Sequence, residues 1–457
     1  MSRNCNHCAG LSRSRLLHRA AAEAGRGLPL IEPGMPLPAG TGMSRRSFVA
    51  RGLGAALSVY GADKLLPGLF EDGIALAASG PAQPILVSVF LEGGADALSV
   101  LSPQGDPLYG RLRPKLGLSG GTQFAEDGRL FWHPSLASLV QLYGEQKVTV
   151  MPAIGYTNAD QSHFTSRHYW EVGATSTQLR TGWLGRYLDR VGTMDNPLQG
   201  LSLDDTLAPA LATAKVPVAS IDGPDQYDFW SRNVWGEVET RMLGAIGSFG
   251  NGGGDPALAA AAGAQAQVAQ LRNQLLSFQG DDGIKSPVAY PKSNDAFPRR
   301  LAGLAAMIAS GLPLRVVALT APGHYDTHSD QADALAQGLQ LTSDSLLAFQ
   351  RDVEARGLAD RVLVHVWSEF GRRGAENGSG GTDHGAAGVG FLVGTHAKGQ
   401  MIGEFPGLKS GLDDDGNVKA TADFRGVYAS LLEQWLGMDA AAVIPGAGSF
   451  ARAALLK

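Results

Sequence analysis

The chain has 457 residues, of which 44% are hydrophobic and 18% are charged, with a formal net charge of −5. This is ordinary globular composition for one large domain or two smaller ones, and the negative charge argues against a nucleic-acid partner. Cys5 and Cys8 are the only cysteines, so the chain beyond them folds without a disulfide.

The first 43 residues form a basic leader that we expect to be disordered. Its Cys5-Asn6-His7-Cys8 run resembles half of a zinc site, but a complete site needs four ligands, and His18 is the only further candidate nearby. A structural zinc site in residues 1–43 is therefore the alternative interpretation. Met43 is an alternative start of the protein.

Residues 44–77 carry the pattern of a twin-arginine export signal. Arg45-Arg46 precedes a mildly apolar stretch, and Ala75-Leu76-Ala77 supplies the small residues that a signal peptidase reads. Charged residues interrupt the stretch, so it is too polar for a stable membrane span; the alternative is a chance arginine pair before a helix. The pattern predicts passage through the Tat translocase, cleavage near Ala77, and a periplasmic, cell-wall or extracellular location.

Residues 84–457 are predicted to form a single α/β domain with a large insertion around residues 180–300. Continuous apolar runs, which are typical of strands buried on both faces, alternate with long helical stretches. This alternation predicts a mostly parallel sheet with helices on both faces. The expected strands are Ile85–Leu91, Val148–Ile154, Leu314–Thr320, Val362–Trp367 and Val389–Val393; the expected helices are Asp255–Gly280, Ala296–Ser310, Asp330–Arg356 and Thr421–Leu436; and Gly247–Gly254 is expected to be a loop.

Polar residues gather directly after the expected strands. Ligands of parallel α/β sheets bind beyond the carboxyl ends of the strands, so these polar clusters are expected to meet in one candidate site. The clusters are Glu92–Asp96, Asn158–His163, His324–His328, Ser368–Arg372 and Thr382–Gly385.

Metal-ligand chemistry fits these clusters. His324-x-Asp326-x-His328 places imidazole and carboxylate groups on one short loop, a set typical of zinc, manganese or iron sites. The predicted metal ligands are Asp96, Asp326, His328, Glu369, Asp383 and His384. The predicted catalytic residues are Ser162 as a nucleophile, His163 as an acid–base group and Arg372 as a contact for an anionic substrate.

Each of these residues also has a structural interpretation. Asp96 follows two glycines and is equally consistent with a turn, and Ser162 is more readily explained as the cap of the next helix. Arg372 is as consistent with solvated charge as with substrate binding, and His365, inside an expected strand, is interpreted as a core histidine. The sequence has no P-loop motif, which argues against a P-loop phosphate site.

Several stretches resemble the DUF1501 proteins, an exported family placed in the alkaline-phosphatase/sulfatase-like superfamily. They run from residue 90 to 437 and read FLEGGADALSVLSP, HPSL, QSHFTSRHYWEVG, HYDTHSDQ, SEFGRR, GTDHGAAGVGFLVG and DFRGVYASLLEQWLG. The resemblance implies an exported protein with an alkaline-phosphatase-like α/β fold.

The superfamily resemblance further implies a two-metal phosphatase or sulfatase site. Glu369-Phe370 stands where an Asp-His pair is expected, so one ion would lose an imidazole ligand. The positions that match the rest of such a site are Asp96 after the first strand, Asp326 and His328 as an Asp/His pair with a shorter spacing than usual, His384 as the last histidine, and Ser162 or Thr165 as the nucleophile.

These expectations combine into an exported, metal-dependent hydrolase of phosphate or sulfate esters that holds one or two divalent ions, with zinc or manganese favoured. Its expected partner is a small anionic ester or a polysaccharide substrate, and no nucleic acid. The alternatives are a non-catalytic exported binding protein with a decayed metal site, and a metal-free Ser/His hydrolase. We expect Asp96, Asp326, His328, Glu369 and His384 to converge at one edge of the sheet.

Overall fold

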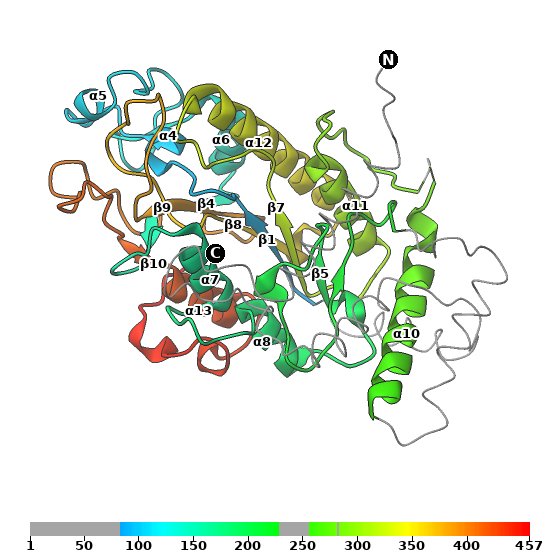
Figure 1. Ribbon diagram of the computed structural model, residues 1–457. Helices are drawn as coiled ribbons and strands as arrows, with labels where there is room; N and C mark the ends of the chain where they lie inside the picture. The colour runs from blue at the N-terminus through cyan, green and yellow to red at the C-terminus, as the bar shows by residue number, and fades with distance from the viewer. Residues whose placement is uncertain (1–82, 228–255, 281–282) are drawn as a thin grey trace, which may run out of the picture.

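The computed structural model describes residues 83–227, 256–280 and 283–457 (Figure 1). The basic leader, the twin-arginine signal, Asp255 and the Gly247–Gly254 loop lie outside these residues. Within the described ranges, no helix is both long and apolar enough to cross a bilayer. Export therefore stays a prediction.

An eight-stranded sheet forms the centre of the described chain (Figure 1). In spatial order its strands are β10 (Ala422–Asp423), β4 (Val148–Gly155), β9 (Gly388–Val393), β8 (Val362–Trp367), β1 (Ile85–Phe90), β7 (Val316–Thr320), β5 (Gly200–Ser202) and β6 (Ala219–Ser220). Only β9 runs antiparallel to its neighbours in this sheet, β4 and β8. The predicted mostly parallel sheet is confirmed.

Strand β1 shows why the central strands are apolar along their whole length. Ile85, Val87 and Val89 belong to one hydrophobic core, whereas Leu86 and Phe90 belong to the core on the opposite face. Successive side chains of a strand point to opposite faces, so a strand that is covered on both faces needs apolar residues at consecutive positions. The continuous apolar runs of the sequence therefore mark the centre of the sheet.

Helices cover both faces of the sheet (Figure 1). One face carries α6 (Ala137–Gly144), α11 (Phe297–Ala309) and α12 (Gln331–Ala355). The other carries α7 (His163–Val172), α8 (Trp183–Val191) and α13 (Phe424–Gln434). This arrangement confirms the predicted α/β class. The remaining α-helices of the described residues are α4 (Ala97–Val100), α5 (Tyr109–Leu112) and α10 (Pro256–Leu275).

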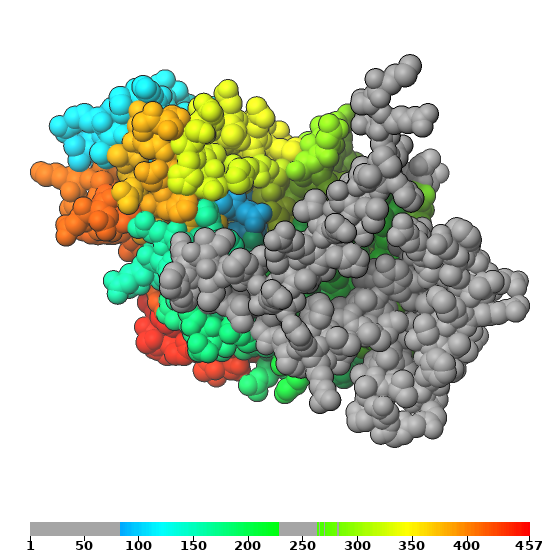
Figure 2. All heavy atoms as spheres, in the orientation of Figure 1, coloured from blue at the N-terminus to red at the C-terminus, as the bar shows by residue number. Residues whose placement is uncertain are grey.

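Two segments that are far apart in the sequence lie side by side at one end of the molecule (Figures 1 and 2). The first contains α5 and the antiparallel pair β2 (Leu101–Ser102) and β3 (Phe131–Trp132); the second follows β9. Leu408 donates its backbone N–H to Asp106 Oδ2 at 2.9 Å, and Arg129 Nη2 donates to the Phe405 carbonyl at 3.0 Å. These hydrogen bonds hold the two segments together.

The expected strands and long helices lie within a few residues of their predicted ends. The short strands β5 and β6 were not predicted, and they fall within the 180–300 stretch that was expected to be an insertion. They pair with β7 and with each other, so this stretch contributes to the edge of the central sheet. Strands of two or three residues are too short to show a periodic pattern. The assignment of residues 84–457 to one domain stays a prediction.

Candidate metal centre

Residues that follow three strands of the sheet meet in one group. His163 is the first residue of α7, after β4; Asp326 and His328 lie on the loop after β7; and His384 lies between β8 and β9. These positions lie beyond the strand ends at which α/β sheets bind ligands. We refer to His163, Asp326, His328 and His384 as the His–Asp cluster.

The donor atoms of the His–Asp cluster point at one another. The Nε2 atom of His384 lies 3.0 Å from the Nε2 atom of His163 and 3.0 Å from that of His328. The Asp326 Oδ1 atom lies 3.4 Å from the Nε2 atoms of His163 and His384, and 3.1 Å from that of His328. Three imidazole nitrogens and a carboxylate oxygen therefore surround one small space.

The other ring nitrogen of each histidine faces a hydrogen-bond acceptor. His163 Nδ1 lies 2.7 Å from Glu369 Oε1, His384 Nδ1 lies 2.8 Å from the Gln161 carbonyl, and His328 Nδ1 lies 3.3 Å from Asp383 Oδ1. We assign the ring proton to Nδ1 in each case, because only an N–H can donate to these acceptors. Each Nε2 atom then presents a lone pair to the centre of the cluster.

This donor set fits a divalent transition metal ion. Two facing lone pairs cannot hydrogen-bond to each other, whereas a shared cation satisfies both. Donors placed tetrahedrally at zinc's bond lengths of about 2.0 to 2.1 Å are about 3.3 to 3.4 Å apart, close to the separations of 3.0 to 3.4 Å among His163, Asp326 and His384. Among the described residues, these three form the group whose ligand atoms all lie within 4.8 Å of one another, and His328 lies next to two of them.

The charges around the cluster favour the metal-binding forms of Asp326 and His384 but not of His163. Burial would lower the pKa of His163, but its hydrogen bond to Glu369 and the charges of Glu369 and Asp326 raise it. Burial alone would raise the pKa of Asp326, but its hydrogen bond to Arg372 and the positive charge there lower it to about 2. Burial, together with the neighbouring His163, lowers the pKa of His384. Asp326 is thus ionised and His384 neutral near pH 7, which are the protonation states that metal ligands need.

Glu369 and Asp383 were predicted as metal ligands, but the structure places them behind the histidines. The Glu369 side chain is buried and accepts hydrogen bonds from Gly93 N at 3.0 Å and from Ser368 Oγ at 3.1 Å, in addition to its contact with His163. Asp383 contacts His328 Nδ1 from the outside of the cluster. A carboxylate in this position fixes the orientation of the ring and the position of its proton.

A family model described as "Protein of unknown function (DUF1501)" matches residues 84–444. The chain belongs to the DUF1501 family. No curated protein matches it. The family assignment agrees with the resemblance seen in the sequence.

Solved structures similar to this DUF1501 protein share little sequence with it. The soluble domain of lipooligosaccharide phosphoethanolamine transferase A from Neisseria meningitidis is 10% identical, with 78% of this chain and 89% of that chain covered and a TM-score of 0.35. The phosphonate monoester hydrolase SpPMH from Silicibacter pomeroyi is 12% identical, with 81% and 75% covered and a TM-score of 0.34. The PsFucS1 sulfatase from Pseudoalteromonas sp. is 11% identical, with 93% and 80% covered and a TM-score of 0.33. Alignments with scores this low carry no argument about the chain's function.

Arg372 has a positioning role in this DUF1501 protein, whereas the sequence predicted a contact with substrate. Its side chain is fully buried. Its guanidinium donates to the carbonyls of Gly93, Gly94, Tyr325 and Thr382, and to Asp326 Oδ1 at 2.7 Å. These bonds hold the loops after β1, β7 and β8 together and aim Asp326 at the histidines. A guanidinium engaged in this way is not free to receive an anionic substrate.

Asp96 does not join the His–Asp cluster, although the sequence predicted it as a ligand. It caps α4 and is paired in two contacts with Arg113, whose Nη2 lies 2.9 Å from Asp96 Oδ1; both side chains are fully buried. Gln331 Nε2 also donates to Asp96, at 2.6 Å. The turn interpretation was therefore the better one for this residue. An aspartate whose oxygens are already bound by an arginine has little capacity for a metal ion.

A chain of contacts nevertheless links Asp96 to the cluster of this DUF1501 protein. Thr382 Oγ1 donates to Gln331 Oε1 at 2.6 Å, and Arg372 Nη1 donates to the Thr382 carbonyl at 2.8 Å. Asp96, through Gln331, thus stabilises the loop that carries Thr382 and the neighbouring His384. Its influence on the cluster is indirect.

Phe370 forms an apolar wall at the point where the sequence predicted a lost metal ligand. Its buried ring lies 4.8 Å from the His163 ring and 4.9 Å from the His384 ring, measured between centroids. Gly94 makes room for it, because a Cβ atom there would lie 2.3 Å from Phe370 Cε2, and Gly94 also has φ +71°. One side of the cluster is therefore closed to water.

The side chains of the predicted nucleophiles, Ser162 and Thr165, make no hydrogen bond to the His–Asp cluster. Ser162 occupies the N-cap position of α7, as the alternative interpretation expected, although its hydroxyl makes no cap hydrogen bond. The Thr165 side chain is buried, and His324 is exposed on the loop before Asp326. His365 is fully buried in β8, which agrees with a core histidine.

His163 was predicted to be an acid–base group, and the structure places it among the candidate metal ligands. The sequence indicated a helix after Ser162, but not its orientation relative to the loops after β7 and β8. The usable signal was its place in the polar run that follows the strand now assigned as β4. The run indicated the edge of the sheet at which His163 lies, but not the side chains that it would contact.

Proposed function

We propose that this DUF1501 protein is a metal-dependent hydrolase of phosphate or sulfate esters that holds one divalent ion in the His–Asp cluster. The observation that carries the proposal is the convergence of His163 Nε2, His328 Nε2 and Asp326 Oδ1 within 3.0 to 3.4 Å of His384 Nε2. Imidazole with carboxylate suits zinc first and manganese second. The class of ester comes from the family resemblance.

A divalent ion in the cluster would supply Lewis acidity toward an ester oxygen and toward water. The chain's own residues prepare that site. Glu369 keeps the His163 proton on Nδ1, and Arg372 keeps Asp326 ionised and aimed inward. Phe370 closes one side, whereas the His328 side chain is 47% exposed. Substrate therefore has access from the side of His328.

Turnover of simple aryl esters tests this function. The purified exported protein, reconstituted with zinc or manganese, is expected to hydrolyse p-nitrophenyl phosphate or p-nitrophenyl sulfate, and a chelator should abolish that turnover. A protein that holds stoichiometric metal but turns over neither ester would contradict the hydrolase proposal and favour the exported binding protein. Turnover that resists complete removal of metal would favour the metal-free Ser/His hydrolase.

We also propose export by the Tat route with cleavage near Ala77, on the support of Arg45-Arg46 and Ala75-Leu76-Ala77. Replacing both arginines by lysine should leave the precursor in the cytoplasm, because the paired arginines are the recognition signal. Fractionation followed by immunoblotting measures the result. Wild-type levels of export for the Lys-Lys variant would rule out this route.

A further inference from the structure

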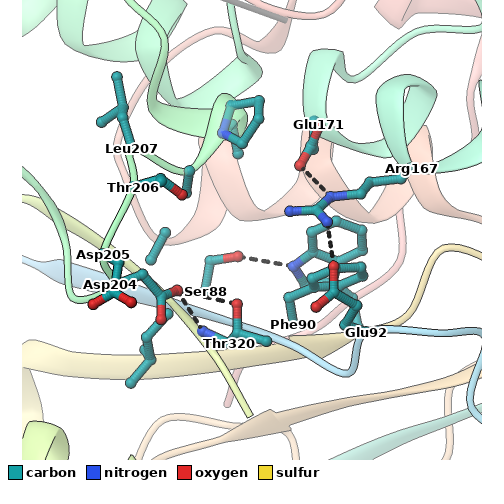
Figure 3. Close-up of a pocket in the computed structure, with 16 residues that line it drawn as sticks. Ser88, Phe90, Glu92, Arg167, Glu171, Asp204, Asp205, Thr206, Leu207 and Thr320 are labelled. Carbon is teal, nitrogen blue, oxygen red and sulfur yellow. Dashed lines mark hydrogen bonds and ion pairs between the residues drawn. The ribbon is translucent and has the colours of Figure 1, made fainter. Parts of the chain in front are cut away.

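A cavity lies between α7 and the loop after β5 (Figure 3). Its volume is about 440 Å³. Its walls come from the carboxyl ends of β1, β7 and β8, from the loop after β5, and from α7. We refer to the cavity bounded by Glu92, Arg167, Glu171, Asp204, Asp205 and Trp367 as the acidic pocket.

The acidic pocket and the His–Asp cluster are built from the same segments. His163, Arg167 and Glu171 follow one another at four-residue intervals on α7, so they lie along one side of the helix, and one such interval spans about 6 Å. Glu92 precedes Gly93, whose N–H donates to Glu369, the partner of His163. A substrate whose reacting group lies in the cluster can therefore extend into the pocket.

Carboxylates outnumber cations among the residues that line the pocket. Among the described residues, Arg167 is the one cation in the lining, and it is already paired with Glu92 and, at 2.8 Å, with Glu171 (Figure 3). Burial raises the pKa of Glu171 to about 7, against the opposing pull of Arg167. Arg300 is paired with Asp204 at 2.6 Å and with Asp205 at 3.8 Å. Even with Glu171 counted as neutral, Glu92, Asp204 and Asp205 outnumber the two guanidinium groups of Arg167 and Arg300. The pocket therefore carries a small excess of negative charge.

Two of these carboxylates are exposed to solvent, although each also has an ion-pair partner. The Asp205 side chain is 89% exposed and lies 3.8 Å from Arg300, and that of Glu92 is 53% exposed and is paired with Arg167. Asp204 is more occupied, because it accepts from Thr320 N at 2.9 Å and from Arg300 Nη1 at 2.6 Å. Figure 3 shows Asp204 and Asp205 on the wall opposite Arg167 and Glu92. A cation between these walls would meet negative charge on both sides.

The floor of the pocket is apolar and rigid. The rings of Phe90 and Trp367 are stacked with centroids 4.4 Å apart, and Trp367 Nε1 donates to Ser88 Oγ at 2.9 Å. The Arg167 guanidinium lies over the Phe90 ring, 4.6 Å from its centroid. Packed rings of this kind accept the carbon skeleton of a small ligand, while the polar groups at the rim select its charge.

We propose that the acidic pocket binds the non-reacting part of the substrate and selects a group that carries an ammonium, such as an amino alcohol or an amino sugar. The role as a substrate subsite rests on the proposed hydrolase function. The preference for an ammonium rests on the pocket's own carboxylates, so binding can test it without any turnover.

Two matched pairs of probes test the charge preference. Ethanolamine is compared with ethylene glycol, and glucosamine with glucose, by ligand-observed NMR on the full exported chain at a pH where the amines are protonated. We expect at least one amine to bind about fivefold or more tightly than its neutral partner, because the exposed carboxylates each add a modest attraction. Added salt at about 0.5 M should remove most of the preference, because it screens exposed charges. A response to ethanolamine indicates a site for an amino alcohol, and a response to glucosamine alone indicates an amino sugar.

Variants decide whether the acidic pocket is responsible. The double variant Glu92→Gln, Asp205→Asn should lose the amine preference, whereas the control Asp414→Asn, Asp415→Asn, on an exposed turn, should keep it. Equal affinity within both pairs, no binding of any probe, or an unchanged preference in the pocket variant would overturn the inference. Metal content is measured on the same samples: amine binding without bound metal would refute the metal-dependent function alone, and bound metal without amine preference would refute the pocket alone.

Discussion

Replacing His384 by alanine should remove the metal ion from the protein. Its Nε2 atom lies 3.0 Å from the Nε2 atoms of both other histidines, so it is the donor shared by the closest contacts of the cluster. We expect metal affinity to fall by more than about 100-fold, a larger loss than the 10- to 100-fold typical of changes behind the ligands. A zinc titration monitored by calorimetry measures the change in metal affinity.

Two further variants make the test selective. Glu369→Gln keeps an oxygen near His163 Nδ1 but removes the charge, and it should weaken metal binding about 10-fold. His324→Ala lies on the same loop as Asp326, yet its side chain is exposed, and it should bind metal as the wild type does. Equal losses in the His324 and His384 variants would contradict the assigned ligand set.

Replacing Arg113 by methionine should lower the free energy of unfolding by about 3 to 5 kcal/mol, because it leaves the Asp96 charge buried without its partner. Both side chains are fully buried, and Arg113 Nε also donates to the Gly374 carbonyl at 3.0 Å. The loop next to Arg372 therefore loses support as well. Urea unfolding monitored by circular dichroism measures the change.

A partly exposed ion pair provides the matched control for this variant. Arg351 pairs with Glu354 at 2.8 Å, and the two side chains are 29% and 26% exposed. Arg351→Met should therefore cost less than about 1 kcal/mol. If both methionine variants lose the same stability, burial of the Asp96–Arg113 pair is not the cause.

The pH dependence of the Arg113 variant follows from the state of Asp96. Burial alone would raise the pKa of Asp96, but the charge and hydrogen bonds of Arg113 outweigh it, so the folded pKa is lowered. In the wild type this carboxylate therefore contributes stability above the unfolded pKa, and that contribution is lost as the pH falls through the lower folded pKa. Without Arg113, burial raises the pKa of Asp96, so the deficit of the variant should be largest near pH 7 and shrink toward pH 4. An equal deficit at both pH values would contradict this explanation.

The central strands could be predicted because their sequence alone reports their burial. In β1 consecutive apolar residues face two different hydrophobic cores. A strand with one face in water would instead alternate apolar and polar residues. The same reasoning located the candidate site, since it depends only on where strands end. The strands β5 and β6 could not be predicted because two or three residues are too few to show the alternation of apolar and polar residues that marks a strand.

The identity of the ligands could not be predicted in full because it depends on which polar groups satisfy one another. Asp96 has the residue type and position of a ligand, but Arg113, which is distant from the other cluster residues in the sequence, neutralises it. Glu369 was likewise predicted to be a ligand from its position next to Phe370. Its carboxylate instead contacts His163 Nδ1 and the Gly93 amide. Side-chain pairing of this kind appears only when the loops are assembled.

The position of a bound ion tests the central claim most directly. A crystal of the exported protein with zinc, measured at the zinc absorption edge, should show one anomalous peak per chain. That peak should lie about 2.0 to 2.2 Å from Nε2 of His163, His328 and His384 and from a carboxylate oxygen of Asp326. A protein that binds no stoichiometric metal, or a peak coordinated by Asp96 or Glu369 in place of the histidines, would contradict the account.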